Sequence, residues 1–187
     1  MRVITGSAKG RTLFPVPGDS TRPVTDRVKE ALFSILESQG AVEDARFLDL
    51  FGGTGAVGIE ALSRGAAEAV FCEKDRRALA TIQRNLLHTG LAAQARVVAG
   101  DAFAFLQRAD AAAFDLIYIA PPQYRQLWEK ALLLVDACPQ LLTAAGQVVV
   151  QIHPKEDRPL TLASLRRFDE RTYGSTLLVF YGHAPQE

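Results

Sequence analysis

The chain has 187 residues with 48% hydrophobic content, and its 21 basic residues are balanced by 21 acidic ones. This length fits one domain that buries roughly 70% of its unfolded surface, and the zero net charge excludes a protein that binds polyanions by overall charge alone. The first 30 residues nevertheless carry six basic and three acidic side chains. We therefore expect one domain over 1–187, made of a basic N-terminal arm, 1–24, and a core, 25–187.

Cysteine and histidine usage indicates neither a disulfide framework nor a metal site. Cys72 and Cys138 stand in apolar segments without the spacing of metal ligands, and the three histidines are scattered, so reduced thiols are expected. The N-terminus lacks the apolar run of a signal peptide, and no apolar stretch is long enough to span a bilayer. We expect a cytoplasmic, monomeric protein without a membrane partner.

A small hairpin or extended arm is predicted for residues 2–14, where Gly6 and Gly10 separate β-capable runs and Lys9 and Arg11 are presented. A rigid, proline-containing loop at 15–19 follows it. The excess of positive charge makes this end of the chain the candidate face for phosphate contacts. A merely solvated charged surface is the alternative.

A helix is predicted from about Thr25 to Gly40, because apolar residues recur at helical spacing between 28 and 36. Thr25 is a suitable N-cap. Arg22 and Arg27 lie at or just before the helix start. They suit either surface ion pairs or the binding of a phosphate or a cofactor carboxylate.

From residue 46 onward, strand and helix patterns alternate. Strands are predicted at 47–51, 69–73, 96–99, 114–119 and 147–152, with helices at 56–64, 78–86, 103–106 and 127–135. Repeated βαβ units predict an α/β fold with a mostly parallel sheet, helices on both faces, and ligands at the carboxyl ends of the strands. The tail differs, since 167–172 and 176–181 are typical of two antiparallel strands joined by a tight turn.

Asp49 lies in the first predicted strand, 47–51, which leads into a glycine-rich loop, and this arrangement indicates a ligand site. Gly53, Gly55 and Gly58 form the pattern G-x-G-x-x-G, and Glu73 follows at the spacing of about 20 residues that is typical of dinucleotide-binding folds. Such a loop lets the backbone approach a ligand closely and offers it unpaired N–H groups at a helix N-terminus. The pattern predicts a nucleotide-type cofactor without identifying it.

Acidic residues at three strand ends narrow the choice of cofactor. Glu73 suits the hydroxyls of a ribose, and Asp101 with the next backbone N–H suits the amino edge of an adenine. Asp49 before the glycines would repel a pyrophosphate and favours a cofactor that carries positive charge.

These motifs, in this order, resemble those of class I S-adenosylmethionine-dependent methyltransferases. More narrowly, the runs at 21–33 and 58–66, with Arg2, Gly6 and Gly10–Arg11, are similar to the RsmD family of 16S ribosomal RNA guanine-N2 methyltransferases. The resemblance covers nearly the whole chain. It implies a Rossmann-like, seven-stranded, mostly parallel sheet with a C-terminal antiparallel hairpin and a small N-terminal β arm. It also implies S-adenosyl-L-methionine as cofactor and methyl transfer to a guanine N2 amine in 16S rRNA or the assembling small subunit.

The resemblance also implies three sets of site residues in this chain. The cofactor-binding set is Asp49, Phe51, Gly52, Gly53, Thr54, Gly55, Glu73, Lys74, Asp101, Ala102 and Ala120. The RNA-binding set is Arg2, Lys9, Arg11, Arg22 and Arg27. The catalytic set is Pro121, Pro122, Gln123 and Tyr124.

The chain departs from the family's sequence pattern in the turn that holds the catalytic residues. The family's turn after the fourth strand reads Asp-Pro-Pro followed by Tyr or Phe, whereas this chain has Ala120-Pro121-Pro122-Gln123-Tyr124. In such sites the amine of the flipped base donates to that side chain and to the carbonyl of the first proline, while the aromatic ring stacks on the base. We expect Gln123 to supply the missing acceptor through its amide oxygen, with Tyr124 stacking on the base.

Two alternatives stay open. Without the carboxylate, the chain also fits a ribosome-assembly protein that binds S-adenosylmethionine and RNA but transfers the methyl group poorly. An NAD-dependent oxidoreductase on a similar sheet is the weaker alternative, because the chain has no second substrate domain and the Pro-Pro turn would have no role.

Overall fold

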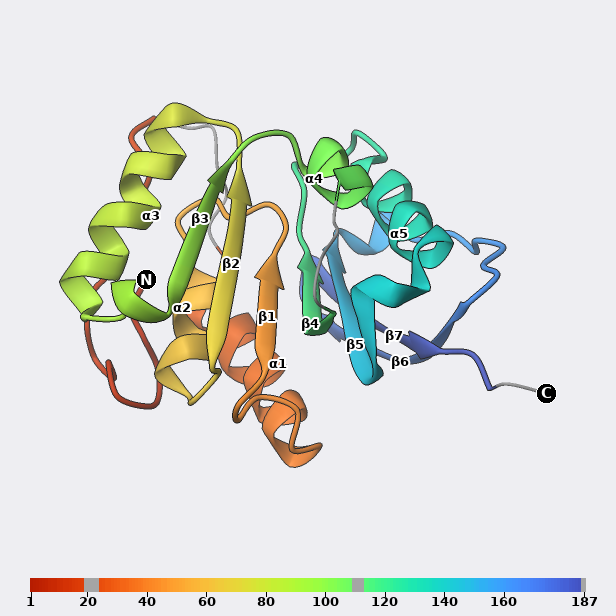
Figure 1. Ribbon diagram of the computed structural model, residues 1–187, viewed down its shortest axis with the longest axis horizontal. Helices are drawn as coiled ribbons and strands as arrows, with labels where there is room; N and C mark the ends of the chain where they lie inside the picture. The colour runs from red at the N-terminus through yellow and green to blue at the C-terminus, as the bar shows by residue number, and fades with distance from the viewer. Residues whose placement is uncertain (19–23, 109–112, 186–187) are drawn as a thin grey trace.

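The computed structural model describes residues 1–18, 24–108 and 113–185, and forms an α/β structure around one seven-stranded sheet (Figure 1). The strand order is β3-β2-β1-β4-β5-β7-β6. Neighbouring strands from β3 through β5 are parallel, whereas β7 is antiparallel to both β5 and β6. The strands are β1 (Arg46–Asp49), β2 (Glu68–Glu73), β3 (Ala95–Ala99), β4 (Phe114–Ile119), β5 (Leu142–Ile152), β6 (Leu165–Tyr173) and β7 (Thr176–His183).

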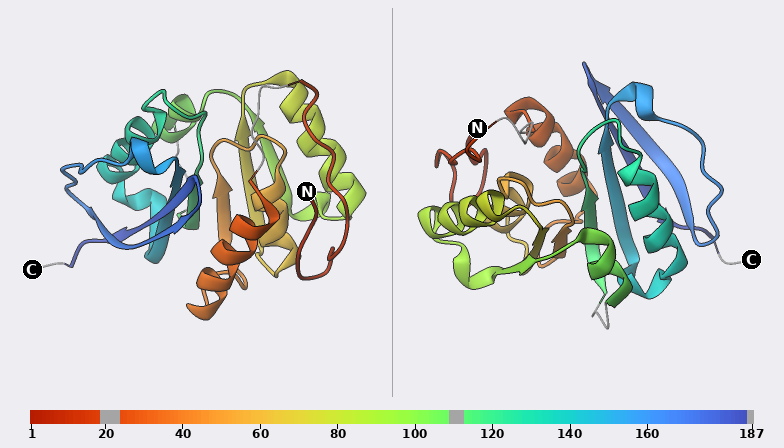
Figure 2. Two further views of the ribbon diagram at one scale, coloured as in Figure 1. Left: turned by 180° about the vertical axis from the view of Figure 1, so that it is seen from behind. Right: turned by 90° about the horizontal axis from the view of Figure 1, so that it is seen from above.

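Helices cover both faces of the sheet, as the sequence predicts (Figure 2). The N-terminal arm packs on one face together with α1 (Asp26–Ser38), α2 (Ala56–Ser63) and α3 (Arg76–Thr89). The other face is covered by α4 (Ala102–Arg108) and α5 (Leu127–Ala137). Alternate residues of each strand point to opposite faces of the sheet. Phe47 of β1 therefore packs in the hydrophobic core beneath α1, α2 and α3, and Leu48 packs in the core beneath α4 and α5.

The predicted N-terminal hairpin and first helix are both present. Arg2 and Thr12 form an antiparallel bridge, and the Val3 N–H donates to the carbonyl of Arg11 at 2.9 Å. In α1, the Thr25 hydroxyl accepts from the Val28 N–H at 3.3 Å and so caps the helix.

The fifth strand is longer than the sequence pattern predicts. It begins at Leu142 and not at 147, and Leu142 pairs with Phe114 before a register shift lets Gln147 pair with Leu116. Residues 143–146 have the composition of a turn and lie within this register shift, between two residues that pair with β4. The Thr143 hydroxyl donates to Oδ1 of Asp115 of β4 at 2.9 Å. Within the described residues, no helix is both long enough and apolar enough to cross a membrane.

Candidate active site

The glycine-rich loop after β1 lies at the carboxyl edge of the sheet and turns directly into α2. Gly53 and Gly55 have φ of 55° and 77°, and the Gly55 N–H donates to the carbonyl of Gly52 at 2.7 Å. Gly58 permits close packing of α2 on β2, because a Cβ there would lie 2.3 Å from the ring of Phe71. The third glycine of the pattern therefore brings helix and sheet together, while the first two shape the loop.

Asp49 at the end of β1 is buried beneath this loop. Its Oδ2 accepts one hydrogen bond, from the Gly58 N–H at 3.2 Å. Burial raises the pKa of this carboxyl to about 7, with the negative charge of Glu73 adding to the rise and the Gly58 N–H opposing it. A carboxylate that is so poorly compensated would be stabilised by a cation.

Glu73 at the end of β2 connects that strand to the loop. Its Oε2 accepts from the Gly53 N–H at 2.9 Å, while its Oε1 accepts from the N–H groups of Lys74 and Asp75 at 2.8 and 2.9 Å. A carboxylate offers about four acceptor positions. These three bonds therefore leave room for one more donor on Oε2.

Asp101 follows β3 and is exposed at the same edge. Its Oδ1 accepts from the N–H groups of Phe103 and Ala104 at 3.0 and 3.1 Å, so it caps α4. The Gly100 N–H donates to the carbonyl of Glu73 at 2.9 Å, which joins the ends of β2 and β3. Asp49, Glu73 and Asp101 thus lie at the ends of β1, β2 and β3, which are neighbours in the sheet.

The remaining residues of the predicted cofactor set lie around this edge with different exposure. Phe51 is half-buried and meets the ring of Phe103 edge-on, with 6.1 Å between centroids. Gly52, Thr54 and Ala102 are buried, Ala120 is half-buried where β4 ends, and Lys74 is exposed.

The turn between β4 and α5 presents the predicted catalytic residues. Pro121 is buried, Pro122 is exposed and Gln123 is half-buried. Tyr124 is 65% exposed and has a positive φ of 60°. Its N–H donates to Oε1 of Glu156 at 2.7 Å, and its ring centroid lies 5.6 Å from that of His153.

Glu156 is a site-lining residue that the sequence analysis did not identify. It follows β5 and completes a capping box with His153, whose side chain accepts from the Lys155 N–H at 3.1 Å. This box holds the loop beside the Tyr124 turn. The spacing of His153 and Glu156 around a proline was the available signal, although the contact with Tyr124 spans 32 residues.

The predicted RNA-binding residues do not form one cluster. Arg11 donates to the carbonyl of His88 at the end of α3, at 3.2 Å, and Lys9 is exposed nearby in the hairpin. Arg2 lies 3.7 Å from Asp26 at the start of α1, where Arg27 is exposed. Arg22 lies outside the described residues.

A buried charged network holds the arm on α1 and α2. Glu60 of α2 pairs with Lys29 at 3.2 Å and with Arg64 at 2.8 Å, and the side chains of Lys29 and Glu60 are both fully buried. Glu60 also accepts from the backbone N–H groups of Ile4 and Thr5 at 2.9 and 3.0 Å. Charged residues among the apolar positions of two predicted helices were the sequence signal for this network.

Asn85 of α3 joins the arm to the glycine-rich loop. Its Oδ1 accepts from the Phe14 N–H at 2.8 Å, and its Nδ2 donates to the carbonyls of Phe14 and Thr54 at 3.0 and 2.9 Å. The side chain is fully buried. Displacement of the arm therefore removes support from the loop that precedes α2.

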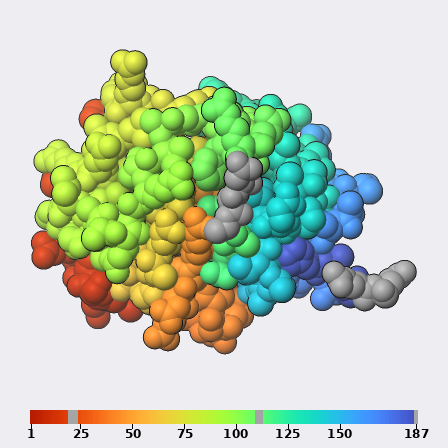
Figure 3. Space-filling model, viewed as in Figure 1, coloured from red at the N-terminus to blue at the C-terminus, as the bar shows by residue number. Residues whose placement is uncertain are grey.

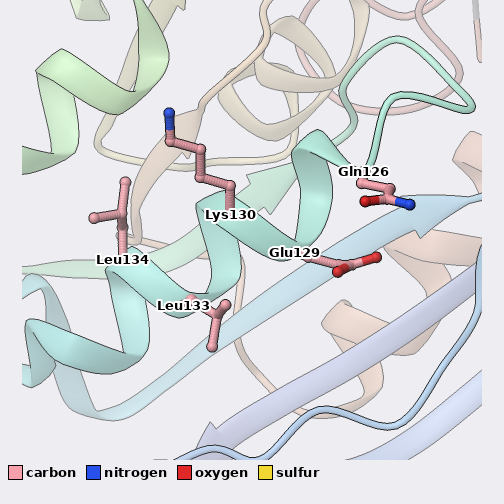
Figure 4. A pocket seen from close by; sticks show the side chains of 5 residues that line it. All are labelled: Gln126, Glu129, Lys130, Leu133 and Leu134. Atoms are coloured by element: carbon pink, nitrogen blue, oxygen red, sulfur yellow. The ribbon is translucent and has the colours of Figure 1, made fainter.

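A shallow depression of about 400 Å³ lies along the outer side of α5 and is lined by Gln126, Glu129, Lys130, Leu133 and Leu134 (Figure 4). Its two charged side chains already have partners, because Glu129 pairs with Arg158 and the Lys130 ammonium lies 4.2 Å from the ring centroid of Phe103. Among the described residues, no group of three or more His, Cys, Asp and Glu could hold a metal ion.

Comparison with known proteins gives consistent matches across the whole chain. A family model described as "Conserved hypothetical protein 95" matches residues 1–182. Ribosomal RNA small subunit methyltransferase D of Escherichia coli (strain K12) is 41% identical over 137 residues, which are 73% of this chain and 67% of that protein.

Solved structures share the fold. The Escherichia coli protein yhhF, provisionally described as a methyltransferase, is 35% identical with a TM-score of 0.85, over 100% of this chain and 99% of that chain. An RNA methyltransferase from Salinibacter ruber, solved with S-adenosyl-L-homocysteine, has a TM-score of 0.64 at 18% identity, over 89% and 95% of the two chains.

Proposed function

Because the chain belongs to the family described as "Conserved hypothetical protein 95", the RsmD family of class I methyltransferases, we propose that it methylates the exocyclic N2 amine of a guanine in 16S rRNA. Its cofactor is S-adenosyl-L-methionine, and its substrate class is ribosomal RNA. The observation that carries the proposal is the alignment of three carboxylates at adjacent strand ends beside an open Pro-Pro turn. The partner is 16S rRNA, free or in the assembling small subunit, and the protein acts as a monomer.

The residues at the strand ends fit this cofactor by charge and by hydrogen bonding. Asp49 is a buried carboxylate whose raised pKa marks the lack of a positive partner, and S-adenosyl-L-methionine brings a cationic sulfonium and an ammonium group. The open acceptor position on Glu73 suits a ribose hydroxyl, and Asp101 with the Ala102 N–H suits an adenine edge. The bound cofactor supplies an electrophilic methyl group.

The Ala120–Tyr124 turn orients the target amine. We propose that the carbonyl of Pro121 and the amide oxygen of Gln123 accept the two N–H bonds of the guanine amine, so that its lone pair points at the methyl group. Tyr124 stacks on the flipped base, which its 65% exposure and its backbone bond to Glu156 favour. Water takes the proton from the ammonium that the transfer creates, so no general base is needed.

A rate comparison tests this role of Gln123. Under-methylated small subunits and labelled S-adenosyl-L-methionine are incubated with wild type, Gln123→Ala, Gln123→Glu and Ala120→Asp. We expect Gln123→Ala to lower kcat roughly 100-fold, the effect of losing one preorganised hydrogen bond, and Gln123→Glu to restore much of it, since an acceptor returns.

One observation favours a second candidate function. The chain has Ala120 where the family has a carboxylate, which fits a protein that binds cofactor and RNA during subunit assembly without transferring the methyl group. A silent wild type together with an active Ala120→Asp variant would refute catalysis by the natural chain and favour this function in binding.

A further inference from the structure

The N-terminal arm lies along α3 over nearly the whole length of that helix (Figures 1 and 2). Arg11 bonds to the carbonyl of His88 in the last turn, and the ring of Phe14 lies 5.2 Å from that of His88. Gly18 lies beside Arg77 in the first turn, where a Cβ on the glycine would be 3.5 Å from Nη1. Arm and helix therefore form one continuous surface, here called the arm–α3 face.

The arm–α3 face carries positive charge only. Residues 1–18 and 76–89 contain no aspartate or glutamate, and their basic residues are Arg2, Lys9, Arg11, Arg76, Arg77 and Arg84. Two of the six approach carboxylates outside the face, Arg2 at 3.7 Å from Asp26 and Arg77 at 3.9 Å from Asp75. Within the part of the chain that the structure describes, the other four have no carboxylate within 4.0 Å.

Arg84 lies over the ring of Phe14 on the arm while it remains exposed. The central carbon of its guanidinium lies 3.5 Å from the ring centroid of Phe14. Phe14 is itself fixed, because both its backbone N–H and its carbonyl bond to Asn85. A guanidinium ordered in this way loses little conformational freedom when it binds a phosphate or stacks on a base.

The arm–α3 face begins at the candidate active site. The first turn of α3 follows Glu73 by three residues, and Glu73 bonds to the glycine-rich loop. With 14 residues, the helix carries the charged surface for roughly 20 Å away from that edge. Figure 3 shows the red atoms of the arm bordering the yellow-green surface of this part of the molecule.

We propose that the RNA flanking the target nucleotide binds the arm–α3 face through its phosphate backbone, with Arg76 and Arg84 as its principal contacts on the helix and Lys9 and Arg11 on the arm. This inference rests on the proposed function. RNA is favoured as the occupant because the face combines cations that lack carboxylate partners, an ordered guanidinium and an extended shape that leads to the site. A ribosomal protein with an acidic surface is the other outcome of the test.

The experiment measures the affinity of a 16S rRNA fragment by fluorescence anisotropy over a series of salt concentrations. The variants are Arg76→Gln and Arg84→Gln, and the matched control is Arg166→Gln on the exposed side of β6. We expect each α3 variant to weaken binding about 3- to 10-fold and to reduce the slope of log K against log salt by about 0.7–0.9, the value for one lost phosphate contact. The control should leave both unchanged, and calorimetry should show unchanged affinity for S-adenosyl-L-homocysteine in all three.

Arg76→Gln keeps the test independent of arm packing, because the cation–π contact with Phe14 belongs to Arg84. The proposal is overturned if both α3 variants match Arg166→Gln in affinity and slope. It is also overturned if naked RNA binds them normally while protein-bearing subunits bind poorly, since the face would then recognise a ribosomal protein. A wild type that binds RNA with the expected slope but transfers no methyl group would refute the proposed function and leave this binding surface standing.

Discussion

Replacing Asp49 by asparagine should stabilise the protein and weaken its cofactor binding. The pKa of this carboxyl rises from its ordinary value of 3.8 to about 7 because the group is buried. Between those two values the folded chain holds a proton that the unfolded chain releases, so stability falls as pH rises through this window and stays low above it. A rise of this size corresponds to about 4 kcal/mol of unfolding free energy above the folded pKa.

Asparagine has the same shape and can still accept from the Gly58 N–H, so it removes the buried charge alone. We expect urea unfolding to show Asp49→Asn more stable than wild type, with the difference growing by about 2–3 kcal/mol between about pH 5 and pH 8.5. Asp101→Asn is the matched control, since it makes the same substitution at an exposed strand end. Calorimetry should show the Asp49 variant binding S-adenosyl-L-methionine more weakly. A stability difference that stays constant with pH would refute this reasoning.

Three further changes test how the arm is held. Asn85→Ala should lower the unfolding free energy by about 2–4 kcal/mol in urea titration, because one buried and two part-buried hydrogen bonds are lost and backbone groups stay unpaired; a loss under 1 kcal/mol would contradict this. Gly6→Ala should displace the hairpin, since its Cβ would lie 1.7 Å from a backbone oxygen of α2, whereas Gly10→Ala meets no atom within 4 Å and should cost only about 1 kcal/mol; equal protease sensitivity of the two variants would count against the packing described. Lys29→Met should cost about 3–5 kcal/mol by leaving Glu60 with less compensation, and an unchanged thermal midpoint would show that the buried pair contributes nothing.

Local patterns were sufficient to predict the alternating strands and helices, the C-terminal hairpin and the cap at Thr25. These features depend on periodicity and turn chemistry within a few residues. The start of β5 was predicted five residues late, because the turn-like residues 143–146 lie in a register shift and only Leu142, before them, pairs with Phe114 of β4. Sequence reasoning also placed Asp49, Glu73 and Asp101 at strand ends, since parallel strands bring their carboxyl ends to one edge.

The contacts that support the site could not be predicted in the same way. Glu60 bonds to backbone groups 55 and 56 residues away, and Asn85 bonds to a residue 71 positions away. Such bonds depend on how helices and arm pack, and a single polar residue in a helix pattern does not reveal its partner. The sequence indicated a basic surface in the first 30 residues only. In the structure the arginines of α3 lie beside the arm, and their positions in a predicted helix did not reveal this neighbour.

The identity of the methylated nucleoside tests the proposed activity most directly. Under-methylated small subunits are treated with wild-type protein and labelled S-adenosyl-L-methionine, and the 16S rRNA is digested and separated by chromatography with mass detection. We predict that the label appears in N2-methylguanosine. Label in another nucleoside would contradict the orientation of the amine by Pro121 and Gln123, and the absence of label from the RNA would contradict the assignment as a methyltransferase of ribosomal RNA.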